Sequence, residues 1–377
     1  MHPDMHPLIV TPLYPPAIGG AATYFSMVAP GLAARPEIDQ VTVLTECLPG
    51  EPAEWSDGKL RVLRRLPTRV SVAHRSWAVR AQSYALTQWW FNAHFVALAR
   101  QLSIDVIHLH TRYHGRALFA ALRRSNIPVI ANLHDKLTEP RGLMAVADRL
   151  LCCADSVHQF VLRSGYPTHR CVSLPLPLDV RLAQSGESVA DTHRGYGLKS
   201  APYVLFVGDI TARKGVYDLL QGYQQWHAEP PAQLVFAGAN WEGVRFLRQV
   251  QRTPGAMYVG PVPRAEALQL IRGAAVVVMP SHSEAISYVI LEAIALGIKV
   301  ICPPDIPEYE RYLADSVLPV VNAAAIARAL DAAWNRTDSP AYPLAPHSPD
   351  RVMSGLANLY ASVISQRAQP VADQPRA

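Results

Sequence analysis

Short runs of apolar residues alternate with longer amphipathic segments along most of the chain. An apolar run of about four to eight residues predicts a buried strand, and a longer segment with apolar positions three or four apart predicts a helix. In the first half, these patterns predict strands at 8–13, 41–45, 60–64, 106–109 and 129–132, helices at 19–34, 77–102 and 115–124, and a last unit over 157–163 and 171–174. Continuous apolar strands joined by helices indicate a parallel sheet covered on both faces.

The pattern breaks after residue 174, where prolines and glycines interrupt a polar stretch. We interpret 178–200 as a linker, because linkers are loosely structured and rich in such residues. The alternation then resumes with strands at 203–207, 234–236, 257–259, 276–279, 300–302 and 317–320, each followed by a helical segment. The sequence thus predicts α/β domains over 1–177 and 201–348, and a C-terminal helix with a disordered tail over 349–377, the tail beginning at 366. Two domains suit a chain of 377 residues.

Composition narrows the class of protein. The net charge is +5 and the pI is near 9, which suits anionic partners such as nucleotide phosphates or anionic lipid. The five cysteines are odd in number and lack a CxxC spacing, so they support neither a disulfide framework nor a zinc site, and a reducing cytoplasm is the expected compartment. Residues 1–7 do not resemble a signal peptide, and no apolar run of about 20 residues predicts a membrane span.

Two loops combine glycine or positive charge with the start of a helix. Gly19 and Gly20 follow the first strand, where a glycine pair lets backbone N–H groups approach a phosphate; an ordinary strand-to-helix turn is the alternative. Arg213 and Lys214 follow the first strand of the second domain and open a helix. Two cations there oppose the helix dipole, so an anion that both neutralise explains them better than a solvated surface pair.

Two carboxylates and a histidine follow other strands. Glu284 lies in the loop after the strand at 276–279, and Glu292 lies eight residues later on the next helix, a spacing that places helical groups on one face. A carboxylate can accept both hydroxyls of a ribose, and unpaired amides at a helix start suit a diphosphate; an exposed helix face is the alternative. His134 ends a first-domain strand, and both a functional and a structural histidine fit that position.

These residues, taken in order, resemble the family-4 glycosyltransferases of the GT-B fold over roughly residues 8–319. The most specific element is the Glu-x7-Glu motif from Glu284 to Glu292, followed by Leu296-Gly297. The remaining elements occur in the family's order: Gly19-Gly20, the Asp-Val-Ile-His of 105–108, Lys214-Gly215, and the Gly-Pro-Val of 260–262.

The resemblance implies an α/β fold of two Rossmann-like domains whose parallel sheets face each other across a cleft, the first binding the acceptor and the second the nucleotide sugar. It implies that Glu292 holds the ribose, that Arg213 and Lys214 neutralise the diphosphate, and that the backbone at Val262 faces the base. The residues that complete the donor site would be Ile286 and the amides of Ser287, Tyr288 and Val289.

The same resemblance assigns the catalytic residues. Glu284 would contact the hydroxyls of the donor sugar, while His134 and the Gly19-Gly20 loop would close the site from the first domain. Family-4 enzymes retain anomeric configuration and generally need no metal, which agrees with the lack of an Asp-x-Asp motif in this sequence. No cofactor is expected, since the nucleotide sugar is a substrate, and fixed cations and amides would stabilise the leaving diphosphate.

Three departures from the family pattern affect the donor site. Asp209 stands where the family often has arginine, so Arg213 would substitute as the phosphate cation. Ala285 and Ser287 replace the usual glycines after the first glutamate, and Leu176-Pro177 replaces the usual Asn-Gly before the linker.

The stretch 59–102 differs from the rest because it combines arginines and aromatic residues without any acid. Such a composition suits an anionic membrane surface; no nucleic-acid motif accompanies it, so no nucleic-acid partner is expected. The alternative, that Trp89, Trp90 and Phe95 are core residues and the arginines are merely solvated, stays open.

The sequence therefore predicts a retaining glycosyltransferase that acts on a glycan or lipid-linked acceptor in cell-surface polysaccharide or glycolipid synthesis. The expected location is the cytoplasm, with or without a peripheral position on the inner face of the membrane. A non-catalytic GT-B subunit that binds sugar nucleotide or a partner protein is the alternative, and Asp209 keeps it open. A GT-B epimerase or phosphorylase shares the fold.

Overall fold

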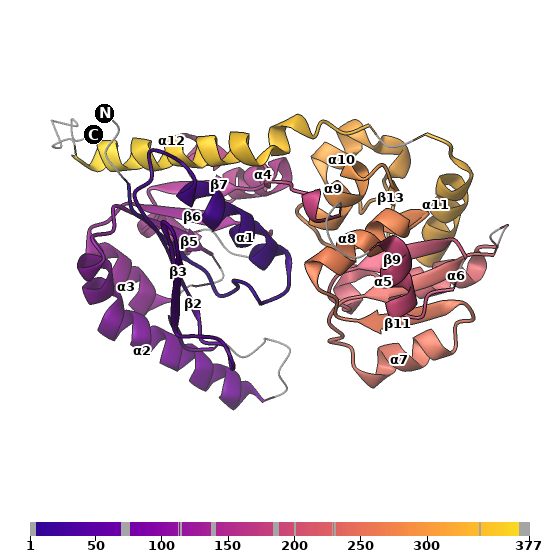
Figure 1. The fold of residues 1–377 in the computed structure, drawn as a ribbon. Helices are drawn as coiled ribbons and strands as arrows, with labels where there is room; N and C mark the ends of the chain where they lie inside the picture. The colour runs from indigo at the N-terminus through magenta and orange to yellow at the C-terminus, as the bar shows by residue number, and fades with distance from the viewer. Residues whose placement is uncertain are drawn as a thin grey trace. The chain divides into compact units, whose positions relative to one another are not determined.

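The computed structural model describes residues 5–68, 76–111, 113, 115–136, 141–183, 188–199, 201–227, 229, 231–338 and 341–368. The chain divides into two compact units. The first contains residues 1–177 together with 349–377, and the second contains residues 178–348. Each unit is an α/β structure built on its own sheet (Figure 1).

The first unit is built on an eight-stranded sheet with the order β3-β4-β2-β1-β5-β6-β7-β8. Its strands are β1 Pro7–Val10, β2 Val41–Glu46, β3 Glu54–Asp57, β4 Leu60–Leu66, β5 Val106–His110, β6 Val129–Leu133, β7 Arg149–Cys152 and β8 Cys171–Ser173. All neighbouring pairs are parallel except β3 with β4. The parallel sheet predicted from the apolar runs is therefore confirmed.

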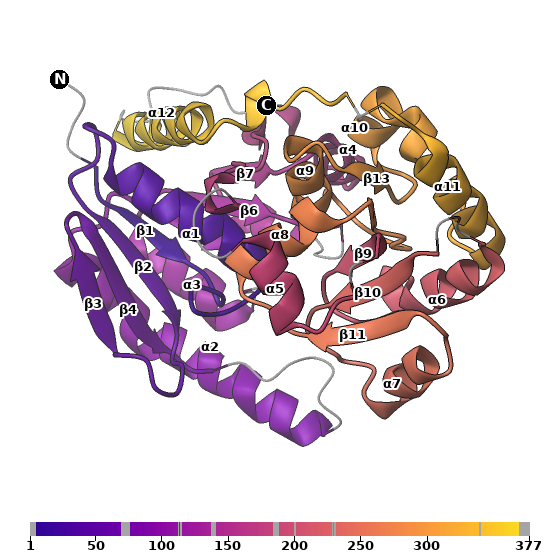
Figure 2. The same cartoon turned by 45° about the vertical axis from the view of Figure 1, so that its right-hand side comes forward.

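Helices cover both faces of this sheet, as the continuously apolar strands require. They are α1 Gly20–Ala33, α2 Trp77–Gln101, α3 Arg116–Ser125, α4 Asp155–Arg163 and α12 Pro349–Ala368. Figure 2 shows α2 and α3 together on the face of the sheet opposite α1, and α1 packs against α12. None of the helices in the described part of the chain has the length and apolar character needed to cross a membrane.

The second unit has a five-stranded, wholly parallel sheet in the order β11-β10-β9-β12-β13. Its strands are β9 Tyr203–Val207, β10 Gln233–Ala237, β11 Ala256–Gly260, β12 Val276–Val278 and β13 Lys299–Ile301. Its helices are α5 Val189–Gly195, α6 Val216–Gln225, α7 Val244–Gln251, α8 Arg264–Gly273, α9 Tyr288–Ala295, α10 Pro307–Tyr312 and α11 Ala323–Asn335. The helices pack in pairs, α6 against α11 and α8 against both α5 and α9.

The C-terminal helix α12 completes the first unit. It buries Tyr360 against the sheet, where the hydroxyl lies 2.6 Å from Nδ1 of His108 on β5. The other ring nitrogen of His108 is 3.1 Å from the amide nitrogen of Asn132 on β6. Burial lowers the pKa of His108 to about 3, so the ring is neutral. Its Nε2 accepts from the Asn132 amide, and its one proton stays on Nδ1, which donates to the Tyr360 hydroxyl.

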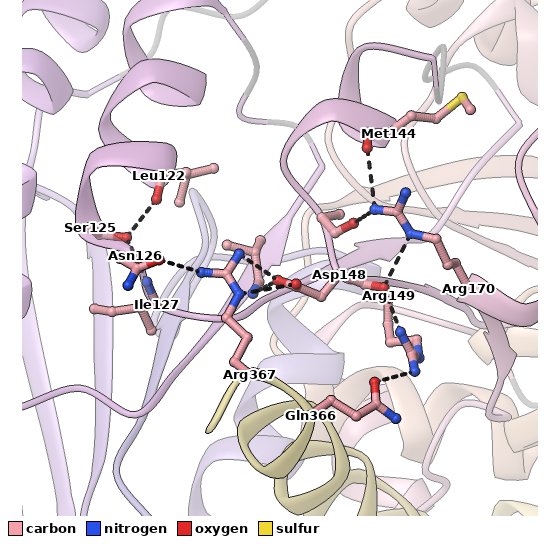
Figure 3. Close-up of polar contacts among 12 residues, drawn as sticks. Leu122, Ser125, Asn126, Ile127, Met144, Asp148, Arg149, Arg170, Gln366 and Arg367 are labelled. Carbon is pink, nitrogen blue, oxygen red and sulfur yellow. Dashed lines mark hydrogen bonds and ion pairs between the residues drawn. The ribbon is translucent and has the colours of Figure 1, made fainter. Parts of the chain in front are cut away.

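The last turn of α12 is attached to the same unit by surface contacts (Figure 3). Arg367 lies 3.3 Å from the Asp148 carboxylate and donates to the side-chain oxygen of Asn126, also at 3.3 Å. The side chain of Gln366 accepts a hydrogen bond from Arg149 at 2.6 Å. The helix therefore extends past 366, where the tail was expected to begin, and residues 369–377 lie outside the described residues.

The segment 178–200, predicted to be a linker, is instead part of the second unit in its described residues. The Ser188 hydroxyl accepts a hydrogen bond from the Asp191 amide and caps α5, which packs on α8. The carbonyl of Ala183 accepts hydrogen bonds from two side chains of α8, Gln269 at 2.9 Å and Arg272 at 3.0 Å. The prediction was wrong because glycines and polar residues were interpreted as loop, whereas this helix depends on tertiary contacts.

Two predicted strands also differ from the structure. The first strand ends at Val10 rather than at residue 13, because the Thr11 side chain bonds the backbone of Leu13 and turns the chain. The apolar segment at 317–320 forms no strand; Val317 makes a single parallel bridge with Cys302.

Candidate functional site

The second sheet has a topological switch point between β9 and β12. The chain runs outward from β9 through β10 and β11, and then returns to place β12 on the other side of β9. In open parallel sheets, ligands bind outside the carboxyl ends of the strands at such a point. The loops that leave β9 and β12 carry Lys214 and Glu284, so the topology brings the two predicted motifs to one place.

Direct contacts tie these two loops together. Nη1 of Arg213 donates to the carbonyl of Ser283 at 2.7 Å, and the amide of His282 donates to the carbonyl of Arg213 at 2.9 Å. The ammonium of Lys214 forms an ion pair with the Glu284 carboxylate, and both side chains are largely buried. The predicted phosphate cation and the predicted sugar-binding carboxylate are therefore neighbours.

Gly215 allows the loops to approach this closely. Its φ is +69°, and a Cβ added there would lie 1.9 Å from the backbone oxygen of Pro280. A side chain at this position would therefore meet backbone rather than a flexible group, and the φ angle itself disfavours other residues.

Glu292 is buried on α9, with 5% of its surface exposed. One carboxylate oxygen, Oε1, lies 2.6 Å from Nη1 of Arg264, the first residue of α8. Burial raises the pKa of Glu292 to about 6, and the Arg264 guanidinium opposes that rise. At neutral pH the carboxylate is thus mainly ionised and paired, ready to accept hydrogen bonds.

The prediction that Glu284 and Glu292 lie on one face of a helix is wrong. The helix begins at Tyr288, so Glu284 lies outside it and does not share a helical face with Glu292. Glu284 is positioned by Lys214, and Glu292 by Arg264. Each carboxylate therefore has its own cation.

The other predicted donor-site residues surround the start of α9 or lie next to α8. Ile286, Ser287, Tyr288 and Val262 are buried and Val289 is half-buried. The Ser287 amide donates to the hydroxyl of Tyr309 at 3.0 Å, so this amide is already bonded and does not fit the expected role at a diphosphate.

Sequence reasoning missed two charged residues near these loops. Arg264 shows the same signal as Arg213 and Lys214, a cation at a helix start, and that signal could have found it. Glu242 accepts a hydrogen bond from the amide of Ala212 at 2.7 Å and another from the Tyr217 hydroxyl at 3.0 Å. No sequence motif marks Glu242, because its place depends on the loop after β10.

The first sheet has its own switch point between β1 and β5. Gly19, with φ +137°, caps α1 after β1, and a Cβ added to it would meet no atom within 4 Å. The preceding loop is fixed by the buried side chain of Arg64 on β4, which donates to the carbonyl of Pro15 and lies 3.5 Å from the Glu51 carboxylate. The loop thus has open space where a Cβ of Gly19 would lie, and it is held at Pro15 by Arg64.

His134 follows β6 in the same unit. Its ring lies edge-on to the ring of Tyr24 on α1, with 4.6 Å between the ring centroids, and stacks on the ring of His110, with 5.0 Å between the centroids. Burial lowers the pKa of His134 to about 4, so the imidazole is neutral at neutral pH. Its Nε2 has no hydrogen-bond partner among the described residues. This nitrogen is itself buried, so it is not exposed to solvent.

A metal centre finds no support in the part of the chain that the structure describes. No three His, Cys, Asp or Glu side chains in that part gather as a ligand set for a metal ion.

Comparisons with known proteins assign both units to the same class. The model described as "Glycosyltransferase Family 4" matches residues 18–182, and the model described as "Glycosyl transferases group 1" matches residues 201–336. The two matches fall on the first and second units in turn.

Curated relatives match the chain at low identity. The D-inositol 3-phosphate glycosyltransferase of Geodermatophilus obscurus is 28% identical over 230 residues, which cover 52% of this chain and 51% of that protein. The O-antigen chain mannosyltransferase B of Escherichia coli is 26% identical over 261 residues, which cover 64% of this chain and 65% of that protein. The matched stretch thus spans about half to two thirds of the length of these relatives.

Solved structures match nearly the whole chain in fold. Sucrose-phosphate synthase from Thermosynechococcus elongatus superimposes with a TM-score of 0.70 at 18% identity, covering 97% of this chain and 98% of that one. HepE from Anabaena in complex with UDP-glucose superimposes with a TM-score of 0.64 at 14% identity, also covering 97% and 98%.

The two α/β units, each built on a mainly parallel sheet with a switch point, have the GT-B fold of these solved glycosyltransferase structures. More narrowly, the chain belongs to the group 1, family 4 glycosyltransferases, as the Glu-x7-Glu motif and its accompanying residues predicted.

Proposed function

We propose that this enzyme transfers a sugar from a nucleotide-sugar donor to a glycan or lipid-linked acceptor, with retention of anomeric configuration, in the synthesis of a cell-surface polysaccharide or glycolipid. The observation that carries the proposal is the pair of buried or largely buried carboxylates at the switch point, Glu284 with Lys214 and Glu292 with Arg264. Such a site offers acceptors for sugar hydroxyls and cations for a diphosphate in one place.

The donor half of the proposal rests on the second unit. Glu292 would accept the ribose hydroxyls, Arg213 and Lys214 would neutralise the diphosphate, and Glu284 would contact the donor sugar. The fold match to HepE in complex with UDP-glucose supports a nucleotide-sugar donor. The family resemblance supports retention and a reaction without metal or cofactor.

The acceptor half of the proposal rests on the first unit and on the relatives. His134 and the Gly19-Gly20 loop lie at the carboxyl end of the first sheet, where an acceptor would bind. The relative named O-antigen chain mannosyltransferase B supports a polysaccharide product.

The test is titration calorimetry with UDP-glucose, GDP-mannose and ADP-glucose, followed by NMR of the product anomer. We expect one donor to bind, and we expect Glu292→Ala to abolish or greatly weaken that binding while the fold stays intact. The control is Glu310→Ala, which removes an exposed glutamate of α10 in the same unit. Unchanged affinity in Glu292→Ala would contradict the donor site, and an inverted product would contradict retention.

The alternative of a non-catalytic subunit keeps one observation in its favour. Asp209, exposed in the loop after β9, replaces a family arginine, and the acid Glu242 bonds the Ala212 amide of the same loop. A subunit of this kind would bind the donor and yield neither transfer nor hydrolysis. Release of free nucleotide in the presence of acceptor, measured by chromatography, separates the two functions.

We also propose that the first unit binds an anionic membrane through α2. The structure changes which side chains of 59–102 support this. Arg64 is buried, Arg61 and Arg65 pair with Glu54, and Arg69 and Arg75 lie outside the described residues. Of the three residues that the alternative places in the core, Trp90 and Phe95 are buried, whereas Trp89 is exposed. Support comes instead from exposed apolar side chains of α2: Trp77, Val79, Tyr84, Leu86 and Trp89.

The exposed apolar side chains of α2 recur seven residues apart, Trp77 with Tyr84 and Val79 with Leu86. At about 100° per residue, the two pairs lie on opposite sides of the helix, with Trp89 between them. An amphipathic helix binds a membrane through apolar area together with attraction to anionic lipid. We expect cosedimentation with anionic vesicles and little with neutral ones, and a loss of binding in the double variant Trp77→Ser, Trp89→Ser. The control Trp241→Ser removes an exposed tryptophan of the second unit and should change nothing.

A further inference from the structure

Arg264 connects the donor-site carboxylate to the beginning of the second unit. Its Nη1 lies 2.6 Å from Oε1 of Glu292, and its Nη2 donates to the backbone carbonyl of Asp179 at 2.9 Å. The Glu292 side chain is 6% exposed and that of Arg264 is 23% exposed. One guanidinium therefore holds a buried carboxylate on one side and the segment 178–183 on the other.

No other cation among the described residues takes this role. Of the elements α8, β12 and β13, which pack against α9, only α8 and β13 carry charged side chains, since β12 consists of three valines. Helix α10, whose Tyr309 bonds the start of α9, adds Glu308, Glu310 and Arg311, and the charge that acts on Glu292 is that of Arg264. On α8, Glu266 accepts the Tyr196 hydroxyl and Arg272 donates to the carbonyl of Ala183. On β13, Lys299 donates to the carbonyl of Trp334 at 3.1 Å. Glu292 faces Arg264.

A buried carboxylate needs such a partner to remain charged. Desolvation disfavours the ionised form, and an opposite charge in contact restores it. The pKa of Glu292 is raised to about 6 by burial even with Arg264 in place, because the guanidinium only partly offsets desolvation. Without Arg264 the protonated form would gain population at neutral pH, and a protonated carboxyl offers fewer acceptor sites.

We propose that Arg264 is a positioning residue of the donor site: it holds Glu292 ionised and in one orientation for the ribose hydroxyls, and it anchors that carboxylate to residues 178–183, where the chain enters the second unit. Arg264 takes Oε1, which leaves Oε2 and the second lone pair of Oε1 for the two hydroxyls. That the group bound by Glu292 is a ribose rests on the proposed function, whereas the contact of Arg264 with Glu292 does not.

The direct test measures the ionisation of Glu292 without any ligand. Protein labelled with carboxyl-¹³C glutamate is titrated by NMR, and the Glu292 signal is assigned by its loss in Glu292→Gln. In Arg264→Gln we expect the signal to titrate at least about one pH unit higher than in the wild type, since contact with an opposite charge is worth roughly one to three units. The matched control is Arg272→Gln, which also releases the segment 178–183 from α8 but does not touch Glu292. An unchanged Glu292 titration in Arg264→Gln would overturn the proposal.

The second measurement adds the donor. Affinity for UDP-glucose and GDP-mannose is measured by calorimetry from about pH 5 to about pH 8, a range in which their diphosphates keep their charge. In the wild type, affinity should fall as the pH drops below about 6, because burial raises the pKa of Glu292 to about 6. In Arg264→Gln the fall should begin about one pH unit higher. Relative to the wild type, the loss of affinity should be about twofold at neutral pH and approach tenfold near pH 5, since one pKa unit equals a tenfold change once both carboxyls are mostly protonated. Arg264→Lys should restore part of the loss.

The outcomes separate the two proposals. A loss in Arg264→Gln that is equal at every pH would show a merely structural role and would overturn the inference. If the wild type bound none of the nucleotide sugars while the Glu292 titration still followed Arg264, the proposed function would fail and the coupling would stand.

Discussion

At the scale of single residues, burial acts in opposite directions on the acid and the base at the sheet ends. It raises the pKa of Glu292 to about 6 and lowers that of His134 to about 4. In both cases desolvation favours the neutral form. Near pH 7 the second unit therefore presents a charged carboxylate held by Arg264, and the first unit presents an uncharged imidazole.

Arg213 is the residue that the sequence assigns to the missing phosphate charge. The structure places it exposed in the loop after β9, where it bonds the Ser283 carbonyl. Arg213→Ala should weaken the binding of the nucleotide sugar by about 1.5–3 kcal/mol, the usual contribution of a hydrogen bond to a charged group. It should hardly change the binding of the free nucleoside, which has no phosphate. Calorimetry with both ligands checks this. Arg328→Ala, at an exposed position of α11, is the control, and equal losses for both ligands would exclude a phosphate contact.

The close approach of backbone to Gly215 predicts that a side chain at this position lowers stability. Gly215 and Gly297 have similar φ angles of +69° and +74°, but only at Gly215 would a Cβ strike backbone, at 1.9 Å from the Pro280 oxygen. Gly297→Ala should cost about 1–2 kcal/mol of unfolding free energy from the left-handed conformation alone. Gly215→Ala should cost roughly a further 1–3 kcal/mol from overpacking. Urea unfolding measures both free energies. Equal costs would mean that the loops after β9 and β12 move apart readily to accept the added Cβ.

At the scale of elements, helix α12 shows how a distant segment supports the first sheet. Tyr360→Phe removes the hydroxyl 2.6 Å from His108 and leaves a buried ring nitrogen without its partner, so we expect a loss of about 1–3 kcal/mol. Arg367→Gln, on the last turn of the same helix, breaks exposed contacts with Asp148 and should cost less than about 1 kcal/mol. Thermal unfolding compares them; a larger loss in Arg367→Gln would mean that the surface contacts hold the helix.

The elements also show what local sequence can predict. The long apolar strands and the helix over 77–102 follow from periodicity, which is a local property. Strand β7 was missed because four residues carry too little pattern, and α5 was missed because its seven residues include a glycine and depend on α8. The motif placed Glu284 and Glu292 correctly in the second domain, but their partner cations follow from how strands and helices assemble, which spacing alone does not contain.

At the scale of the whole molecule, the second unit is one continuous stretch and the first is not. A fragment of residues 178–348 should therefore fold cooperatively. It should bind the donor more weakly than the full chain, since it lacks the Gly19-Gly20 loop and His134, which are expected to close the donor site. A fragment of residues 1–177 lacks α12, whose buried face includes Val352, Leu356 and Tyr360, and should expose the apolar surface that this helix covers. Circular dichroism and binding of an apolar dye compare the two fragments. Cooperative unfolding of 1–177 by itself would show that α12 is dispensable.

The insertion of one unit within the other also sets an order of events during synthesis. At roughly 5–20 residues per second, the ribosome needs about 10–30 s to make the 171 residues between position 177 and α12. During that time the nascent first unit has every strand of its sheet but lacks the helix that seals it. The unit that begins first is therefore finished last, and a chaperone that shields apolar surface would have its longest opportunity on the N-terminal half of this chain.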